Sequence, residues 1–226
     1  MPLFRDRRHA GAKLAEALAA EGVGRDALLL AIPRGGVVVA AEAAALLRAE
    51  LDLFTVRKLG VPGRPELAMG AVATGGLVVW NGAIIESLNI REAPMLETLE
   101  RETRELARRE ALYRAGSAPV PAAGRVAVLV DDGIATGATL LAAARALRTA
   151  KPARLLVAAP VAPREVVARF DGEADGVVLV RAQVPFFSVA ACYEDFRQVQ
   201  DAEVAVSLRA FHAGAEPTEE GCEDFL

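Results

Sequence analysis

Short apolar runs alternate along most of this chain with segments in which apolar residues recur at helical spacing. The runs of strand length cover residues 27–32, 51–56, 126–130, 154–159 and 176–180. The segments with helical spacing cover residues 6–21, 37–48, 91–114, 139–149 and 164–170. Strands that alternate with helices predict an α/β fold, in which a central, mostly parallel sheet carries helices on both faces. In such sheets, ligands bind at the carboxyl ends of the strands.

Two segments between the second predicted strand and the long helix break this pattern. Residues 58–64 contain two glycines and a proline, which predicts an irregular, mobile loop. Residues 70–79 alternate around Gly75 and Gly76, which predicts a small hairpin. The stretch 183–226 is less regular, and its end is acidic. A chain of 226 residues suits one α/β domain with appendages.

Composition and charge exclude several classes of protein. The chain is 53% hydrophobic and 25% charged, which is ordinary for a globular protein. A net charge of −4 and scattered basic residues argue against nucleic-acid binding. Cys192 and Cys222 lack the spacing of a zinc site or a disulfide framework. Residues 1–8 are too charged for a signal peptide, and the apolar runs are too short for a membrane span, so we expect a cytoplasmic protein without a membrane partner.

The strongest chemical signal lies in residues 128–141, where an apolar strand ends in Asp131 and Asp132 and a helix follows. Gly133 and Gly137 allow backbone N–H groups to converge, and the helix N-terminus adds unpaired donors and a positive dipole end. Such an arrangement binds phosphate. The two carboxylates repel phosphate and are better placed to accept hydrogen bonds from vicinal sugar hydroxyls. The expected ligand is therefore a ribose phosphate.

This run resembles the ribose-phosphate signature of type I phosphoribosyltransferases: an apolar strand, two acidic residues, two intervening residues, a small residue, Thr-Gly and a Thr two positions further on. Residues 31–36 resemble the family's pyrophosphate-binding loop, and residues 56–58 resemble the start of its flexible catalytic loop. The three motifs occur in the family's order and cover roughly residues 28–160. The resemblance implies the type I phosphoribosyltransferase fold with a small hood region. We expect one domain over residues 1–213, with a peripheral N-terminal helix and a C-terminal hood, and a disordered acidic tail at 214–226.

The resemblance implies Mg²⁺-dependent transfer of ribose 5-phosphate from 5-phosphoribosyl-1-pyrophosphate (PRPP) to a nitrogenous base, with release of pyrophosphate. It implies catalytic roles for Lys58, Asp131 and Asp132, with both aspartates at the metal. The residues implied to bind the substrate are Arg34, Gly35, Gly36, Arg57, Gly133, Ile134, Ala135, Thr136, Gly137, Ala138 and Thr139. The resemblance also implies a cis peptide between Pro33 and Arg34, and a loop over residues 58–73 that closes over the site and excludes water.

One position departs from the family pattern. In the hypoxanthine and guanine branch, an aspartate suited to proton transfer at the base stands where this chain has Ala135. Adenine-type members tolerate alanine at this position, which makes Glu66 a candidate carboxylate by position. Phe186, Phe187 and Tyr193 form either a stacking surface for a heterocyclic acceptor or part of the hood core. The sequence leaves the acceptor open.

Alternatives to these interpretations exist for single motifs and for the function. Lys58 is one of three lysines among 26 basic residues, but a solvated loop lysine is the alternative to a catalytic one. The chain lacks the Gly-Lys-Ser/Thr of a P-loop and the third glycine of a dinucleotide fingerprint. The alternative to an enzyme is a non-catalytic PRPP-sensing or nucleotide-sensing module of the same fold. We expect small-molecule partners, no nucleic acid, and a homodimer as a candidate assembly.

Overall fold

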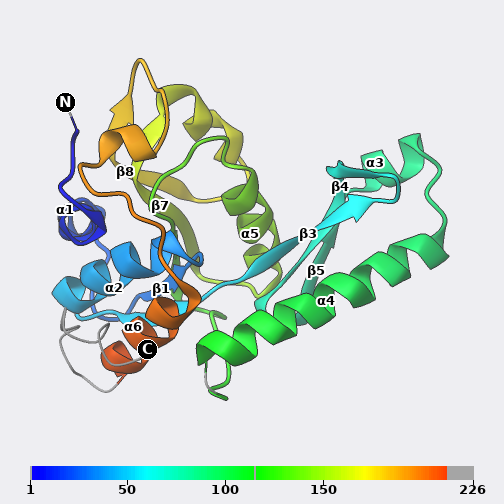
Figure 1. Cartoon of the computed structure of the whole chain (residues 1–226), viewed down its shortest axis with the longest axis horizontal. Helices are drawn as coiled ribbons and strands as arrows, with labels where there is room; N and C mark the ends of the chain where they lie inside the picture. The colour runs from blue at the N-terminus through cyan, green and yellow to red at the C-terminus, as the bar shows by residue number, and fades with distance from the viewer. Residues whose placement is uncertain (1, 115, 213–226) are drawn as a thin grey trace.

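A computed structural model of the chain describes residues 2–114 and 116–212, except for the side chain of Glu66. Its larger sheet has five parallel strands in the order β2-β1-β6-β7-β8. These strands are β1 (Leu28–Ala31), β2 (Glu50–Leu53), β6 (Val126–Val130), β7 (Arg154–Pro163) and β8 (Gly176–Gln183). The structure thus confirms the expected central parallel sheet, with β6 in its middle (Figure 1).

Helices cover both faces of this sheet, as the alternation of strands and helices predicts. The helices of the main body are α1 (Arg7–Ala20), α2 (Gly35–Leu47), α5 (Ala138–Thr149) and α6 (Asp201–His212). Side chains of one strand point alternately to opposite faces, so Leu29 of β1 packs with α1, α2 and α6, whereas Leu28 packs with α5. The N-terminal helix is not peripheral, because Leu14 and Leu18 are fully buried in this core.

A second, antiparallel sheet projects from the main body (Figure 1). It consists of β3 (Val56–Val61), β4 (Arg64–Ala73) and β5 (Leu77–Trp80), and it is accompanied by α3 (Gly82–Ser87) and α4 (Glu92–Arg114). The predicted hairpin corresponds to β4 and β5, which the short 3₁₀ helix η1 (Thr74–Gly76) connects. We call these elements the second lobe.

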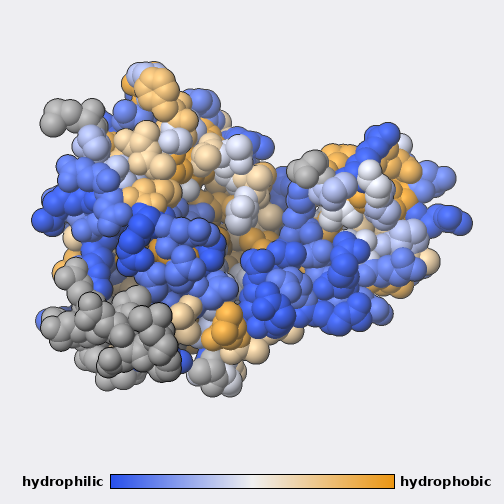
Figure 2. Space-filling model, viewed as in Figure 1, coloured by the Kyte–Doolittle hydropathy of each residue, from blue (hydrophilic) through white to orange (hydrophobic). Residues whose placement is uncertain are grey.

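The prediction of an irregular loop at residues 58–64 is wrong, because most of this segment belongs to β3 and β4. Gly60 lies at a β-bulge, and Pro62 and Gly63 form the tight turn between the two strands. Leu59 and Met69 are fully buried against α4, which explains why this glycine-containing segment forms strands. The outward face of α4 is mostly hydrophilic (Figure 2), although Leu96 and Leu112 of this helix are exposed.

Toward the C-terminus, one expected helix has the expected bounds but another type, and one helix was not expected. Residues Arg164–Phe170 form the 3₁₀ helix η2 rather than an α-helix, since β7 extends to Pro163 and leaves only a short connection before Gly172, where φ is 77°. Helix α6 was not expected from the sequence. The tail at 214–226 lies outside the described residues, so the domain boundaries stay a prediction. No described helix is both long and apolar enough to cross a bilayer.

A buried ion pair ties the second lobe to the main body. Arg114, at the end of α4, donates to Asp52 of β2 at 2.5 Å and to the carbonyl oxygen of Leu53 at 2.7 Å. Asp52 also accepts from the backbone N–H of Val120 at 2.7 Å. The side chains of Asp52 and Arg114 are 3% and 6% exposed, so removing one partner would leave a buried charge poorly compensated.

We expect the substitution Asp52→Ala to lower the free energy of unfolding by about 3–5 kcal/mol, because Arg114 would lose its close counterion and keep only Glu110, at 3.8 Å from its Nε, while the N–H of Val120 would lose its acceptor. Urea unfolding measures this change. The matched control is Arg125→Ala, which breaks the exposed pair between Arg125 and Glu50, and which should cost less than about 1 kcal/mol. Equal losses for the two variants would contradict a structural role for the Asp52–Arg114 pair.

Candidate active site at the ends of β1 and β6

The two predicted substrate loops leave the carboxyl ends of neighbouring strands and touch each other. The segment with Arg34, Gly35 and Gly36 follows β1, and the segment that begins at Asp131 follows β6, the strand paired with β1. A Cβ atom on Gly36 would lie 2.7 Å from the carbonyl oxygen of Val130 and 2.9 Å from Cα of Asp131. Only a glycine therefore permits this approach. The Pro33–Arg34 peptide is cis, as the resemblance implies.

Asp131 and Asp132 lie side by side and are only partly exposed. Oδ1 of Asp131 accepts a hydrogen bond from the backbone N–H of Asp132 at 2.8 Å. Burial and the neighbouring negative charge of Asp132 raise the pKa of Asp131 well above its usual range. Burial also raises the pKa of Asp132, although Arg7 acts in the opposite direction. The pair is thus short of positive charge and suited to a ligand that brings hydroxyl groups or a cation.

Arg7 of α1 is a site residue that the sequence analysis missed. Its Nε donates to Oδ2 of Asp132 at 2.7 Å, and its Nη1 donates to the carbonyl oxygen of Arg197 at 2.8 Å. Its guanidinium carbon lies 3.9 Å from the centre of the Phe196 ring. Nothing in the local sequence distinguishes Arg7 from Arg5 or its other basic neighbours. The contact with Asp132 could therefore be recognised only from the fold.

Arg34 lies against another element that was not predicted. Its Nη1 is 3.8 Å from Oδ1 of Asp201 in the first turn of α6. Asp201 also accepts a hydrogen bond from the Tyr113 hydroxyl at 2.7 Å. Burial and this hydrogen bond raise the pKa of Tyr113 to about 12, so the hydroxyl stays a donor at neutral pH. Helices α4 and α6 thereby help to orient the arginine of the predicted pyrophosphate loop.

The loop between β6 and α5 has the form expected of a phosphate site. Gly137 has a φ of 76° and precedes α5, whose N-terminus has no side-chain cap. The N–H of Ile134 donates to the carbonyl oxygen of Val161 at 2.8 Å, and Arg169 donates to the carbonyl oxygen of Thr136 at 2.5 Å. At the exposed start of α5, the N–H of Ala138 has only a long hydrogen bond of 3.4 Å to Oγ1 of Thr136, so this helix N-terminus is accessible to an anion.

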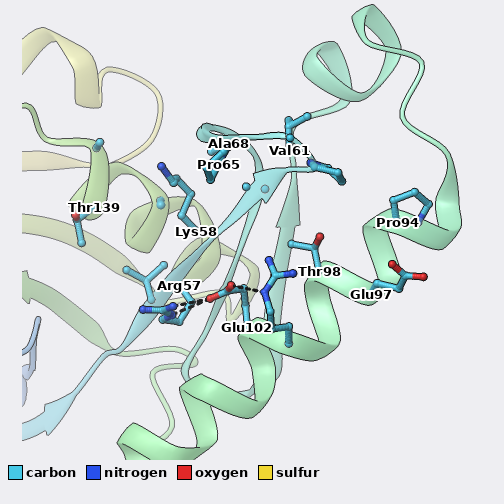
Figure 3. A pocket seen from close by; sticks show the side chains of 18 residues that line it. Arg57, Lys58, Val61, Pro65, Ala68, Pro94, Glu97, Thr98, Glu102 and Thr139 are labelled. Carbon is cyan, nitrogen blue, oxygen red and sulfur yellow. Dashed lines mark hydrogen bonds and ion pairs between the residues drawn. The ribbon is translucent and has the colours of Figure 1, made fainter.

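Arg57 and Lys58 line a cavity of about 890 Å³ beside β3, together with residues of α4 and α5. Figure 3 shows Arg57 reaching Glu102 of α4, whereas Lys58 lies on the side of β3 nearer Thr139 of α5. Arg57 donates to Oε2 of Glu102 from Nε at 3.0 Å and from Nη2 at 2.6 Å. Successive side chains of a strand alternate, so these two predicted ligands face different ways. The described residues that line this cavity do not include Arg34, so the structure does not bring Lys58 and Arg34 together in this cavity.

Of the three aromatic candidates, Tyr193 is a core residue, Phe186 is partly buried and Phe187 is exposed. Tyr193 is 4% exposed, and its hydroxyl donates to the carbonyl oxygen of Asp132 at 2.5 Å. Its ring centre lies 5.3 Å from that of Phe4 and 4.9 Å from that of Phe196. Phe186 packs partly buried against the same cluster, whereas Phe187 is 85% exposed. Tyr193 therefore holds the backbone of the loop that begins at Asp131, which we call the aspartate loop, from its buried side.

Comparison with known proteins is consistent with this geometry. The profile of the phosphoribosyl transferase domain matches residues 6–190. Two proteins of Mycobacterium tuberculosis strains, MT0597 and Rv0571c, both named as candidate phosphoribosyl transferases, are 43% identical over 212 residues. This alignment covers 94% of the chain and 48% of each relative, so the chain spans about half their length. The crystal structure of TT1426 from Thermus thermophilus superposes with a TM-score of 0.84 at 42% identity, covering 93% of this chain and 99% of that one.

We expect Gly35→Ala to destabilise the protein by about 1–3 kcal/mol, because the added Cβ would overlap Oδ2 of Asp132 and lie 2.9 Å from Nε of Arg7. Chemical unfolding measures the loss. Gly24→Ala is the matched control, since a Cβ atom added there would have no neighbouring atom within 4 Å, and it should change stability by less than about 1 kcal/mol. A wild-type stability for Gly35→Ala would mean that the loop contact is loose.

Proposed function

Because the chain belongs to the phosphoribosyl transferase domain family, we propose that it is an enzyme that transfers ribose 5-phosphate from PRPP to a nitrogenous acceptor. The observation that carries this proposal is the contact between two loops at the ends of β1 and β6. One loop presents paired carboxylates beside an open helix N-terminus, and the other presents Arg34. A sugar that bears phosphate at one end and pyrophosphate at the other matches this arrangement.

Each part of PRPP has a counterpart among the residues of the two loops. The 5-phosphate binds at residues 133–139, where the N–H groups at the start of α5 and the Thr136 and Thr139 hydroxyls are donors. The ribose hydroxyls donate to Asp131 and Asp132. The pyrophosphate group binds at residues 34–36, with its charge facing the Arg34 guanidinium.

The donor set at the aspartates fits magnesium. Carboxylate oxygens are ligands that Mg²⁺ accepts, and Mg²⁺ commonly binds through one or two carboxylates together with substrate phosphates. The described residues bring no group of three or more His, Cys, Asp or Glu side chains together, so the substrate would supply the remaining ligands. The raised pKa values of Asp131 and Asp132 agree with a site that needs more positive charge. When bound, the ion neutralises negative charge on the leaving pyrophosphate.

In the chemical step, the acceptor nitrogen donates its lone pair to C1 of the ribose while the bond between C1 and the pyrophosphate oxygen breaks with its electron pair. Positive charge develops on the ribose ring and negative charge on the leaving group, so fixed charges accelerate the step. Asp131 and Asp132 hold the ring, and Arg34 faces the departing oxygens. Lys58 lines a neighbouring cavity and would meet these oxygens when the second lobe closes over the site. Arg57 acts less directly, because Glu102 already binds its guanidinium group.

The acceptor needs a proton partner that Ala135 does not provide, since its methyl group cannot exchange a proton. Glu66 keeps its place as a candidate by position, and its side chain lies outside the described residues. Ala135 is also the observation that favours the alternative, a non-catalytic sensor of PRPP or of a nucleotide. Pyrophosphate release with a panel of purine, pyrimidine and nicotinate-like acceptors separates the two functions. The cytoplasmic location and the homodimer remain predictions from the sequence.

We expect PRPP with Mg²⁺ to stabilise the wild-type protein against heat, and the double variant Asp131→Asn with Asp132→Asn to lose this effect. A ligand at about 100 times its dissociation constant contributes about 2.7 kcal/mol, which corresponds to roughly 5–10 °C for a chain of this size. Thermal unfolding with and without PRPP measures the shift. Equal shifts in both proteins would show that the carboxylates do not bind the ribose, and no shift in either would refute PRPP as the ligand.

We expect Lys58→Ala to lower the turnover number on the order of 100-fold with a small effect on the Michaelis constant for PRPP. Its cation meets charge that develops only as pyrophosphate departs, and such contacts lower the rate more than they change ground-state binding. Steady-state kinetics measures both constants. Lys13→Ala is the control, since Lys13 pairs with Glu16 on the exposed side of α1 and should leave both constants unchanged. A raised Michaelis constant at an unchanged turnover number would assign Lys58 to binding alone.

A further inference from the structure

Arg7 occupies a position that helix energetics and burial both disfavour for an arginine. It is the first residue of α1, where the helix dipole repels positive charge, and Asp6 already caps the helix by accepting from the N–H of His9 at 2.7 Å. Only 9% of Arg7 is exposed, and a buried cation is costly unless it is paired. The carboxylate that pairs with it is Asp132 of the candidate site. The position of Arg7 is therefore explained by its contact with the site and not by any stabilisation of the helix.

The ion pair of Arg7 and Asp132 lies directly beneath the predicted pyrophosphate loop. A Cβ atom on Gly35 would overlap Oδ2 of Asp132 and would lie 2.9 Å from Nε of Arg7. The two groups therefore form the surface on which the backbone of Gly35 rests. A change in the position of Asp132 would move the loops that face opposite ends of PRPP.

Contacts behind Arg7 fix its orientation. Its guanidinium group lies over the Phe196 ring and donates to the carbonyl oxygen of Arg197. The segment that carries Phe196 is held to the N-terminal segment by backbone hydrogen bonds from Phe4 to Cys192 and from Glu194 to Phe4, at 3.0 and 2.8 Å. A planar guanidinium group uses both its face and its edge here, which a lysine ammonium group cannot reproduce.

From these contacts we infer that Arg7 is a positioning residue for PRPP binding. It acts through Asp132 and Gly35 to hold the loop that begins at Asp131 and the loop of residues 34–36 in their relative positions. This inference rests on the proposed function. Arg7 does not touch the substrate in this arrangement. Its hydrogen bond engages Oδ2 and orients the carboxylate, and its charge reduces the repulsion between Asp132 and an anionic ligand.

The test measures the dissociation constant of PRPP with Mg²⁺ by titration calorimetry, together with the thermal stability of each variant. We expect Arg7→Gln to weaken PRPP binding about 10- to 100-fold, which is the effect of losing one charge-assisted hydrogen bond. Arg7→Lys should recover only part of this loss. Arg5→Gln is the control, because it removes the same charge from an exposed neighbouring side chain and should bind PRPP like the wild type.

A double-mutant cycle separates positioning from a purely structural role. If Arg7 acts through Asp132, then Arg7→Gln should weaken PRPP binding much less in an Asp132→Asn background than in the wild type. Equal fold-changes in the two backgrounds would overturn the inference. So would an Arg7→Gln protein that binds PRPP like the wild type, whatever its melting temperature.

A second variant keeps the test possible if Arg7→Gln does not fold. Phe196→Leu removes the stacking contact while keeping both charges, and it should weaken PRPP binding by a smaller factor, roughly threefold to tenfold. Unchanged binding by Phe196→Leu and Arg7→Lys together would overturn the inference. If the wild-type protein itself does not bind PRPP, the proposed function fails, and Arg7 keeps only its observed contact with Asp132.

Discussion

The site depends on one constraint, namely that Asp131 and Asp132 lie side by side at the end of a central strand, partly removed from water. Burial and mutual repulsion both disfavour this arrangement. Arg7 supplies a compensating charge, the N–H of Asp132 supplies a hydrogen bond to Asp131, and Tyr193 holds the backbone of Asp132. Because Arg7 and Tyr193 come from opposite ends of the chain, both terminal segments have to meet at the centre of the sheet. The N-terminal helix is therefore part of the site.

A second set of buried polar contacts determines where the second lobe stands. Asp52 and Arg114 join the end of α4 to β2. Thr74 accepts from the N–H of Thr55, just before β3, and donates to Glu110 of α4 at 2.6 Å. These contacts lie where the chain passes from β2 to β3 and where α4 returns to the main body. They hold the base of the second lobe, from which β3 carries Lys58 to a cavity shared with Thr139 of α5.

The sequence predicts the parts of this site that lie next to each other along the chain, and not the parts that meet only through the fold. The parallel strands, the aspartate loop and the glycines of residues 35–36 follow from apolar runs and turn residues. Arg7 could not be recognised, because an arginine in a first helical turn carries no sign of what it will face. Helix α6 was missed since residues 183–200 before it are irregular. Strands β3 and β4, on either side of the turn at Pro62 and Gly63, were missed because long-range packing of Leu59 and Met69 overrides local preference.

The strand character of β3 also changes how the site can close. A flexible loop could bring Lys58 over the substrate by itself, since its backbone would have few other contacts. Here Leu59, on the strand next to Lys58, is buried against α4 with Met69 and Leu106, and Arg57 is bound to Glu102 of the same helix. Moving Lys58 alone would break this packing. The free-energy cost would be higher than that of moving the sheet of β3, β4 and β5 together with α4 as one body. The closure that the resemblance implies would therefore require β3 and α4 to move together, about the contacts of Asp52 and Thr74.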